Sequence, residues 1–139
     1  MMSTMTDPAD DYAKRQLDRL RAAVPTPWAP HAEPILFDVA RASDFAIDTL
    51  LRQPTLVDSF ASFAPAASLT LARDARPEWG MQLRRHRTAE STRLIWRDVA
   101  GVDDVDATLA GSTRLADQCL QVALEALEGE FAERFGRVR

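Results

Sequence analysis

The sequence has few of the residues from which most metal centres and nucleophilic active sites are built. It contains one cysteine, Cys119, and two histidines, His31 and His86, among 139 residues. One cysteine excludes an internal disulfide, and these three residues are too few for a cysteine–histidine zinc site. Cys119 lies on an apolar stripe of a predicted helix with no histidine near it in sequence, which predicts a buried, inert thiol.

The common catalytic motifs are also absent. The sequence has no glycine-rich phosphate loop, no Gly-x-Ser-x-Gly, no His-Glu-x-x-His and no paired glutamate–histidine motif of di-iron bundles. His86 lies among arginines without an acid–base partner, and His31 lies in a proline-rich linker. We therefore expect no catalytic, cofactor-binding or metal-binding residue in this sequence.

Long apolar runs are missing as well. No stretch approaches the roughly 20 apolar residues that cross a bilayer. The N-terminal residues 1–11 are polar, too acidic for a transit peptide, and lack the apolar centre of a secretory signal. We expect this segment to be disordered or frayed, and the protein to be cytoplasmic with no membrane partner. The net charge of −4 does not favour nucleic acid as a partner.

The apolar residues recur at helical spacing, and no alternation typical of strands is found. The pattern predicts an all-α fold, an irregular bundle of about six helices, as a single domain over residues 12–139. Residues 64–80 contain Pro65, Pro77 and Gly80 and predict an irregular connection with one helical turn around 69–71. Helix starts are predicted at Asp7-Pro8, Glu33-Pro34, Ser43-Asp44, Pro54 and Asp103 or Asp104.

The last two helices are predicted to be the longest, and the first of them, residues 83–101, carries five arginines. At about 100° per residue its apolar side points to a core. That side holds Thr88, Ala89, Thr92, Ile95, Trp96 and Val99, and the other side holds Arg84, Arg87, Glu90, Arg93, Arg97 and Asp98.

The charged side has two interpretations. It is either a solvated surface with weak local ion pairs, or a surface that contacts another domain or a partner. We favour the second because Leu83 and Leu94 lie in the same sector. The predicted interdomain or partner contacts are Arg84, Arg87, Glu90, Arg93 and Arg97.

The final helix carries two apolar stripes. One contains Val105, Leu109, Ala116, Cys119 and Ala123, and the other contains Leu120, Leu124, Leu127, Phe131 and Phe135. Two stripes predict packing against more than one neighbour. Asp104-Val105-Asp106 before these stripes has the spacing of a magnesium-binding Asp-x-Asp, but Gly111-Ser112 follows it rather than preceding it. We interpret these acids as helix caps.

The sequence resembles the bacterial bifunctional glutamine synthetase adenylyltransferase/adenylyl-removing enzymes from about residue 35 onward. The most specific block is Arg93-Leu94-Ile95-Trp96-Arg97-Asp98-Val99-Ala100-Gly101. Weaker matches are Ser43-Asp44-Phe45, Leu50-Leu51-Arg52-x-Pro54, Leu83-Arg84-Arg85-x-Arg87, Glu90 and Arg134-Phe135-Gly136.

The resemblance implies the non-catalytic N-terminal helical part of such an enzyme, which regulates glutamine synthetase by reversible adenylylation of a tyrosine. In the family a glycine-rich stretch and an Asp-x-Asp follow this segment, and this sequence ends at Arg139 before them. We therefore expect the chain alone to be inactive. Mg²⁺ and ATP or ADP are implied only for the full-length enzyme, and the implied partners are its downstream nucleotidyltransferase domain and glutamine synthetase.

The alternative is a free-standing helical interaction module that uses the arginine-rich side. It would bind an acidic protein or a nucleic acid, and the negative net charge already argues against the nucleic acid.

Overall fold

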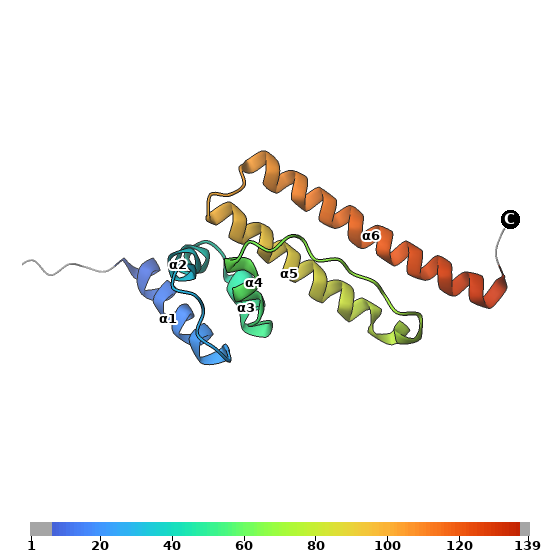
Figure 1. Cartoon of the computed structure of the whole chain (residues 1–139), viewed down its shortest axis with the longest axis horizontal. Helices are drawn as coiled ribbons and strands as arrows, with labels where there is room; N and C mark the ends of the chain where they lie inside the picture. The colour runs from blue at the N-terminus through green and yellow to red at the C-terminus, as the bar shows by residue number, and fades with distance from the viewer. Residues whose placement is uncertain (1–6, 137–139) are drawn as a thin grey trace, which may run out of the picture.

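Six α-helices and one short 3₁₀-helix form the part of the chain that the computed structural model describes, residues 7–136 (Figure 1). No strand occurs in that range, so the all-α prediction is confirmed. The elements are α1 (Pro8–Ala23), α2 (Ala32–Ala42), α3 (Asp44–Arg52), α4 (Leu56–Ala61), η1 (Arg73–Glu78), α5 (Trp79–Val99) and α6 (Val105–Phe135). As predicted, α5 and α6 are the longest, with 21 and 31 residues.

Side chains at three helix starts bind the free backbone N–H groups of the first turn. Asp7 accepts a hydrogen bond from the Ala9 N–H, Ser43 from Ala46, and Asp104 from Ala107. These contacts confirm the predicted starts of α1, α3 and α6. Residues 8–11, which we expected to be disordered or frayed, are helical because Asp7 caps α1. Residues 1–6 lie outside the described residues.

The connection between α4 and α5 differs from the prediction. Residues 64–72 contain no helical turn, so the turn expected around 69–71 is wrong. The helical turn forms later, as η1, where the indole N–H of Trp79 donates to the Ala72 carbonyl at 2.7 Å. Trp79 and Gly80, expected in the connection, are the first residues of α5.

Helices α2, α3 and α4 pack around the C-terminal half of α5, and α1 packs on α2 and α3. Trp96 and Thr92 of α5 are fully buried there, and the Trp96 ring lies 5.9 Å from the ring of Phe60 on α4. Trp96 belongs to a core that also includes Leu20, Leu36 and other apolar residues of α1 to α4. The predicted apolar side of α5 is therefore the core-facing side.

The other long helix, α6, lies antiparallel to α5 (Figure 1). The chain turns between them at Gly101, whose φ of +75° is the left-handed conformation that favours glycine at a helix end. Gly111 of α6 contacts Leu94 of α5 so closely that a Cβ at this position would lie 2.7 Å from a Leu94 methyl group. A side chain at position 111 would thus have to displace the Leu94 side chain where the two helices approach each other.

Neither apolar stripe predicted on α6 is the buried side of the helix, although Cys119 and Ala123 of the first stripe are part-buried. Val105 and Leu109 are 70% and 62% exposed, and the larger residues further along are exposed too. The side against α5 is marked by Gly111 and Leu115, the two buried residues of α6. Sequence periodicity missed this side because small residues carry little apolar signal. Within residues 7–136, no helix combines the length and hydrophobicity needed to span a membrane.

Two glycine substitutions in α6 should act in opposite directions. Gly111→Leu should lower the free energy of unfolding by about 1–3 kcal/mol because the new side chain overpacks the buried Leu94 contact. Gly129→Ala should raise it by about 0.5–1 kcal/mol, since alanine is the better helix former and only the exposed Arg73 guanidinium has to move. Denaturant unfolding of both variants checks this, and equal destabilisation by the two would contradict the α5–α6 packing described here.

Candidate functional site

Residues 64–72, here called the strap, run in an extended path along the two long helices (Figure 1). The strap is attached at Ala67. Its N–H donates to Oε1 of Glu90 on α5 at 3.2 Å, and its carbonyl accepts from Nε2 of Gln118 on α6 at 3.4 Å. One strap residue is therefore bound to both helices.

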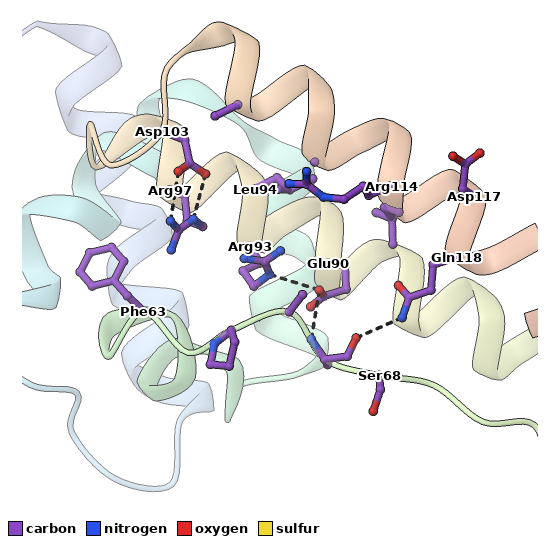
Figure 2. A pocket seen from close by; sticks show the side chains of 16 residues that line it. Phe63, Ser68, Glu90, Arg93, Leu94, Arg97, Asp103, Arg114, Asp117 and Gln118 are labelled. Carbon is purple, nitrogen blue, oxygen red and sulfur yellow. Dashed lines mark hydrogen bonds and ion pairs between the residues drawn. The ribbon is translucent and has the colours of Figure 1, made fainter. Parts of the chain in front are cut away.

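A groove of about 850 Å³ lies between the strap, α5 and the N-terminal half of α6 (Figure 2). Its polar lining comes from residues predicted for the charged side of α5 and from residues of α6 that sequence reasoning did not select. The charged lining residues are Glu90, Arg93, Arg97, Asp103, Arg114 and Asp117. Three arginines and three carboxylates balance, so the groove does not select ligands of either charge.

Glu90 holds the centre of this arrangement. It is buried, and its Oε1 accepts hydrogen bonds from the Ala67 N–H and from Nε of Arg93 at 3.1 Å. A buried carboxylate is costly unless its oxygens are paired, and here a cation and a backbone donor pair it. Figure 2 shows Glu90 between Arg93 and the strap. Glu90 therefore fixes the path of the strap over α5.

Arg97 binds the turn between α5 and α6. Its Nε and one terminal nitrogen donate to the two carboxylate oxygens of Asp103 at 2.8 and 3.0 Å, a two-pronged pair seen in Figure 2. The hydrogen bonds from Arg97 lower the pKa of the Asp103 carboxyl below its usual range. Of the two acids considered as caps, Asp104 caps α6 and Asp103 holds Arg97.

The five predicted contact residues are thus separated into two groups. Glu90, Arg93 and Arg97 lie together at the groove and are bound within the chain. Arg84 and Arg87 are exposed, do not line the groove, and make no ion pair within residues 7–136. That any of the five contacts another domain stays a prediction.

Leu94 was part of the reason for expecting a partner on this side of α5. The structure covers Leu94 with Gly111 of α6, so that the apolar contact comes from the same chain. The groove residues that sequence reasoning missed include those of the strap together with Arg114, Asp117 and Gln118. No sequence signal marks Ala67, because it acts through its backbone groups.

The histidines and the cysteine make ordinary structural contacts. Nε2 of His31 lies 3.0 Å from the Ala61 carbonyl, and Nε2 of His86 lies 3.3 Å from Oε1 of Gln118. Cys119 is half-buried, and this burial raises the pKa of its thiol, which lowers its thiolate fraction at neutral pH. No group of three or more metal-ligating side chains occurs between residues 7 and 136.

Comparison with known proteins confirms the family resemblance. The chain is 53% identical over 129 residues to the bifunctional glutamine synthetase adenylyltransferase/adenylyl-removing enzyme of Xanthomonas campestris. This matched stretch covers 90% of this chain and 14% of the relative. The enzymes of the same name from Xanthomonas oryzae and Stenotrophomonas maltophilia are 56% identical over 105 residues and 50% identical over 124 residues. Those two matches cover 74% and 88% of this chain, and 11% and 13% of the relatives.

The chain therefore spans about a seventh of the length of the curated relatives it matches. No protein-family model matches the sequence. No solved structure matches it either.

Removing the Glu90 carboxylate should release the strap. Glu90→Ala should lower the free energy of unfolding by about 1–3 kcal/mol and speed hydrogen exchange at the Ala67 amide, because the acceptor for that N–H is lost. Glu90→Gln is the matched control, since its amide oxygen can still accept the same hydrogen bond. Unchanged exchange at Ala67 in Glu90→Ala would show that the strap is held by other contacts.

The Arg97–Asp103 pair should stabilise the fold only while Asp103 is ionised. The pKa of Asp103 is lower in the folded chain than the usual value of about 3.9. The ionised carboxylate therefore contributes its full stabilisation of the folded state at pH values above about 3.9, and this stabilisation is lost as the pH falls below about 3.9 and through the lower pKa of the folded chain. The Tm of Asp103→Asn should therefore lie below that of the unaltered chain at pH 6 and approach it toward pH 2–3. Thermal unfolding across this range measures the difference, and a gap that widens on acidification would contradict the pairing.

Proposed function

We propose that this chain, which is homologous to one segment of the bifunctional glutamine synthetase adenylyltransferase/adenylyl-removing enzymes, is a non-catalytic helical segment of such an enzyme. The observation that carries the proposal is the 53% identity over 129 residues, which cover 90% of the chain but only 14% of the relative. A match of this kind supports a role for the chain as one part of a much larger protein. The chemistry of the enzyme then belongs to the other parts.

In this proposal the larger enzyme acts on glutamine synthetase in the cytoplasm, controlling it by attaching and removing adenylyl groups. A nucleotidyltransferase domain downstream of the chain carries out the reactions and binds Mg²⁺ and ATP or ADP. The groove beside the strap supports this division of roles. Four of its charged residues form two pairs, Glu90 with Arg93 and Arg97 with Asp103, and these pairs hold the strap and the α5–α6 turn in place.

The proposed role of the chain is to pack against that catalytic domain and support it. A helical pair can do this because α5 is fixed from two sides, by α1 to α4 through Trp96 and by α6 through Leu94. Arg84 and Arg87 remain available on the surface of α5. Their guanidinium groups are suited to carboxylates of a neighbouring domain, because each offers several donors in one plane.

A chimera tests the proposal directly. This chain would replace the homologous 129-residue stretch of the Xanthomonas campestris enzyme, and both adenylyl transfer to and adenylyl removal from glutamine synthetase would be measured. We expect the chimera to retain both activities, because the segment supplies a packing surface. The Xanthomonas campestris enzyme from which the stretch has been deleted should lose them.

The 139-residue chain alone serves as the second arm of this experiment. Given adenylylated glutamine synthetase, phosphate and Mg²⁺, it should release no ADP above the background without protein. Release of ADP by the chain itself would overturn the non-catalytic role. An inactive chimera that is folded by circular dichroism would overturn the assignment of this segment to the enzyme.

A further inference from the structure

The outward side of α6 carries a row of large apolar side chains, five of them between Leu120 and Phe135 and one, Leu109, about three turns earlier. We call these residues the α6 stripe: Leu109, Leu120, Leu124, Leu127, Phe131 and Phe135. Each is between 43% and 69% exposed. Single exposed apolar residues are common on protein surfaces, but six on one helix form a patch of the kind that marks an interaction site.

The geometry of α6 places the stripe away from the rest of the described chain. At about 100° per residue, its six members fall in one sector of the helix. That sector is directly opposite Gly111 and Leu115, the buried residues against α5. Figure 1 shows α6 along the edge of the molecule, with α5 on one side only. At about 1.5 Å per residue, the 31-residue helix offers a long surface for a second helix.

One flank of the stripe is acidic. Asp106, Asp117 and Glu128 lie beside it at helical spacing and are exposed. Glu125, which is also exposed, and the basic residue Arg114 lie further round the same side of the helix toward α5. None of the four acids forms an ion pair within residues 7–136.

The acids toward the other side of α6 are paired within the chain. Glu130 binds Arg76, with Nε and Oε2 3.3 Å apart, and Glu133 binds Arg73. The charge left without a partner is therefore concentrated on one edge of the apolar surface.

We propose that the α6 stripe binds an apolar helix from the remaining part of the parent enzyme, and that this helix carries lysine or arginine on the edge facing the acidic flank. The inference rests on the proposed function. The chain matches only 14% of the related enzyme, so most of such an enzyme lies outside this segment and can supply the partner helix. Basic side chains on the partner would neutralise the flank and fix the register of the two helices.

A second copy of this chain fits the surface less well. The α6 helix has six acidic and two basic residues, a net charge of −4. An antiparallel two-fold pair would place the acidic flank of each copy against that of the other, and a parallel pair would align two negatively charged helices. Like charges at this distance oppose association. The charge pattern thus favours a basic partner over self-association.

Site-specific labelling tests the proposal without relying on activity. Leu124→Cys, made in a Cys119→Ser background, would be labelled with a maleimide in the 139-residue chain and in the chimera with the Xanthomonas campestris enzyme, and quantified by peptide mass spectrometry. We expect labelling at residue 124 to be at least about tenfold slower in the chimera. The matched control is Phe45→Cys on α3, which is similarly exposed and should be labelled at the same rate in both proteins.

Charge reversal tests the chemistry of the partner. Asp117→Lys with Glu128→Lys should restore fast labelling at residue 124 in the chimera, because the partner helix would then face like charges. Asp58→Lys, an exposed acid on α4, should leave the rate unchanged. Protection at residue 124 that persists after both reversals would overturn the basic partner.

The remaining outcomes separate this inference from the proposed function. A chimera with both activities in which residue 124 is labelled as fast as in the chain alone would overturn the docking inference and leave the proposed function intact. Protection in the chain alone that increases with its concentration would identify a second copy on the stripe, and would also overturn the inference. A folded but inactive chimera would overturn the proposed function, and this inference with it.

Discussion

The burial of two opposite sides of α5 holds the described part of the chain together. Trp96 and Thr92 on one side are enclosed by α1 to α4, and Leu94 on the other side is covered by α6. Burial of apolar surface is the main favourable term in folding, and here it depends on a helix that all the other elements contact directly or through a neighbour. Helices α1, α2 and α3 also pack on one another, and Trp96 of α5 completes the core that they form with α4.

Charged residues of α5 that lie between these two apolar sides bind the segments that pass beside the helix. Glu90 binds the strap and Arg97 binds the turn that leads into α6. Partly buried charges add little net stability, but they specify geometry because an unpaired charge in the same place is costly. Two of the five arginines of α5, Arg93 and Arg97, are therefore used for internal positioning. The outward side of α6 carries most of the large apolar side chains that have no neighbour in residues 7–136.

The sequence predicted that the charged residues of α5 form one surface, but it did not predict that some of them are bound within the chain while others are exposed. Glu90 and Arg93, three residues apart, form the ion pair that their spacing allows. The pairing of Arg97 with Asp103 depends on the turn after Gly101, and the strap contact at Ala67 depends on backbone groups 23 residues from Glu90. Neither contact has a sequence pattern, because side-chain identity at positions 67 and 103 does not reveal which helix passes beside them.

Helix ends and helix content followed from the sequence because the interactions that set them are local. Asp7, Ser43 and Asp104 bind N–H groups two or three residues away, and Gly101 adopts a conformation that its own missing Cβ permits. The covered side of α6 was decided only in the folded chain. Its small residues, Gly111 above all, contribute almost no hydrophobic signal, yet they let α6 approach Leu94 closely. The larger leucines and phenylalanines were left outside because that close approach fixes which side of α6 turns toward α5.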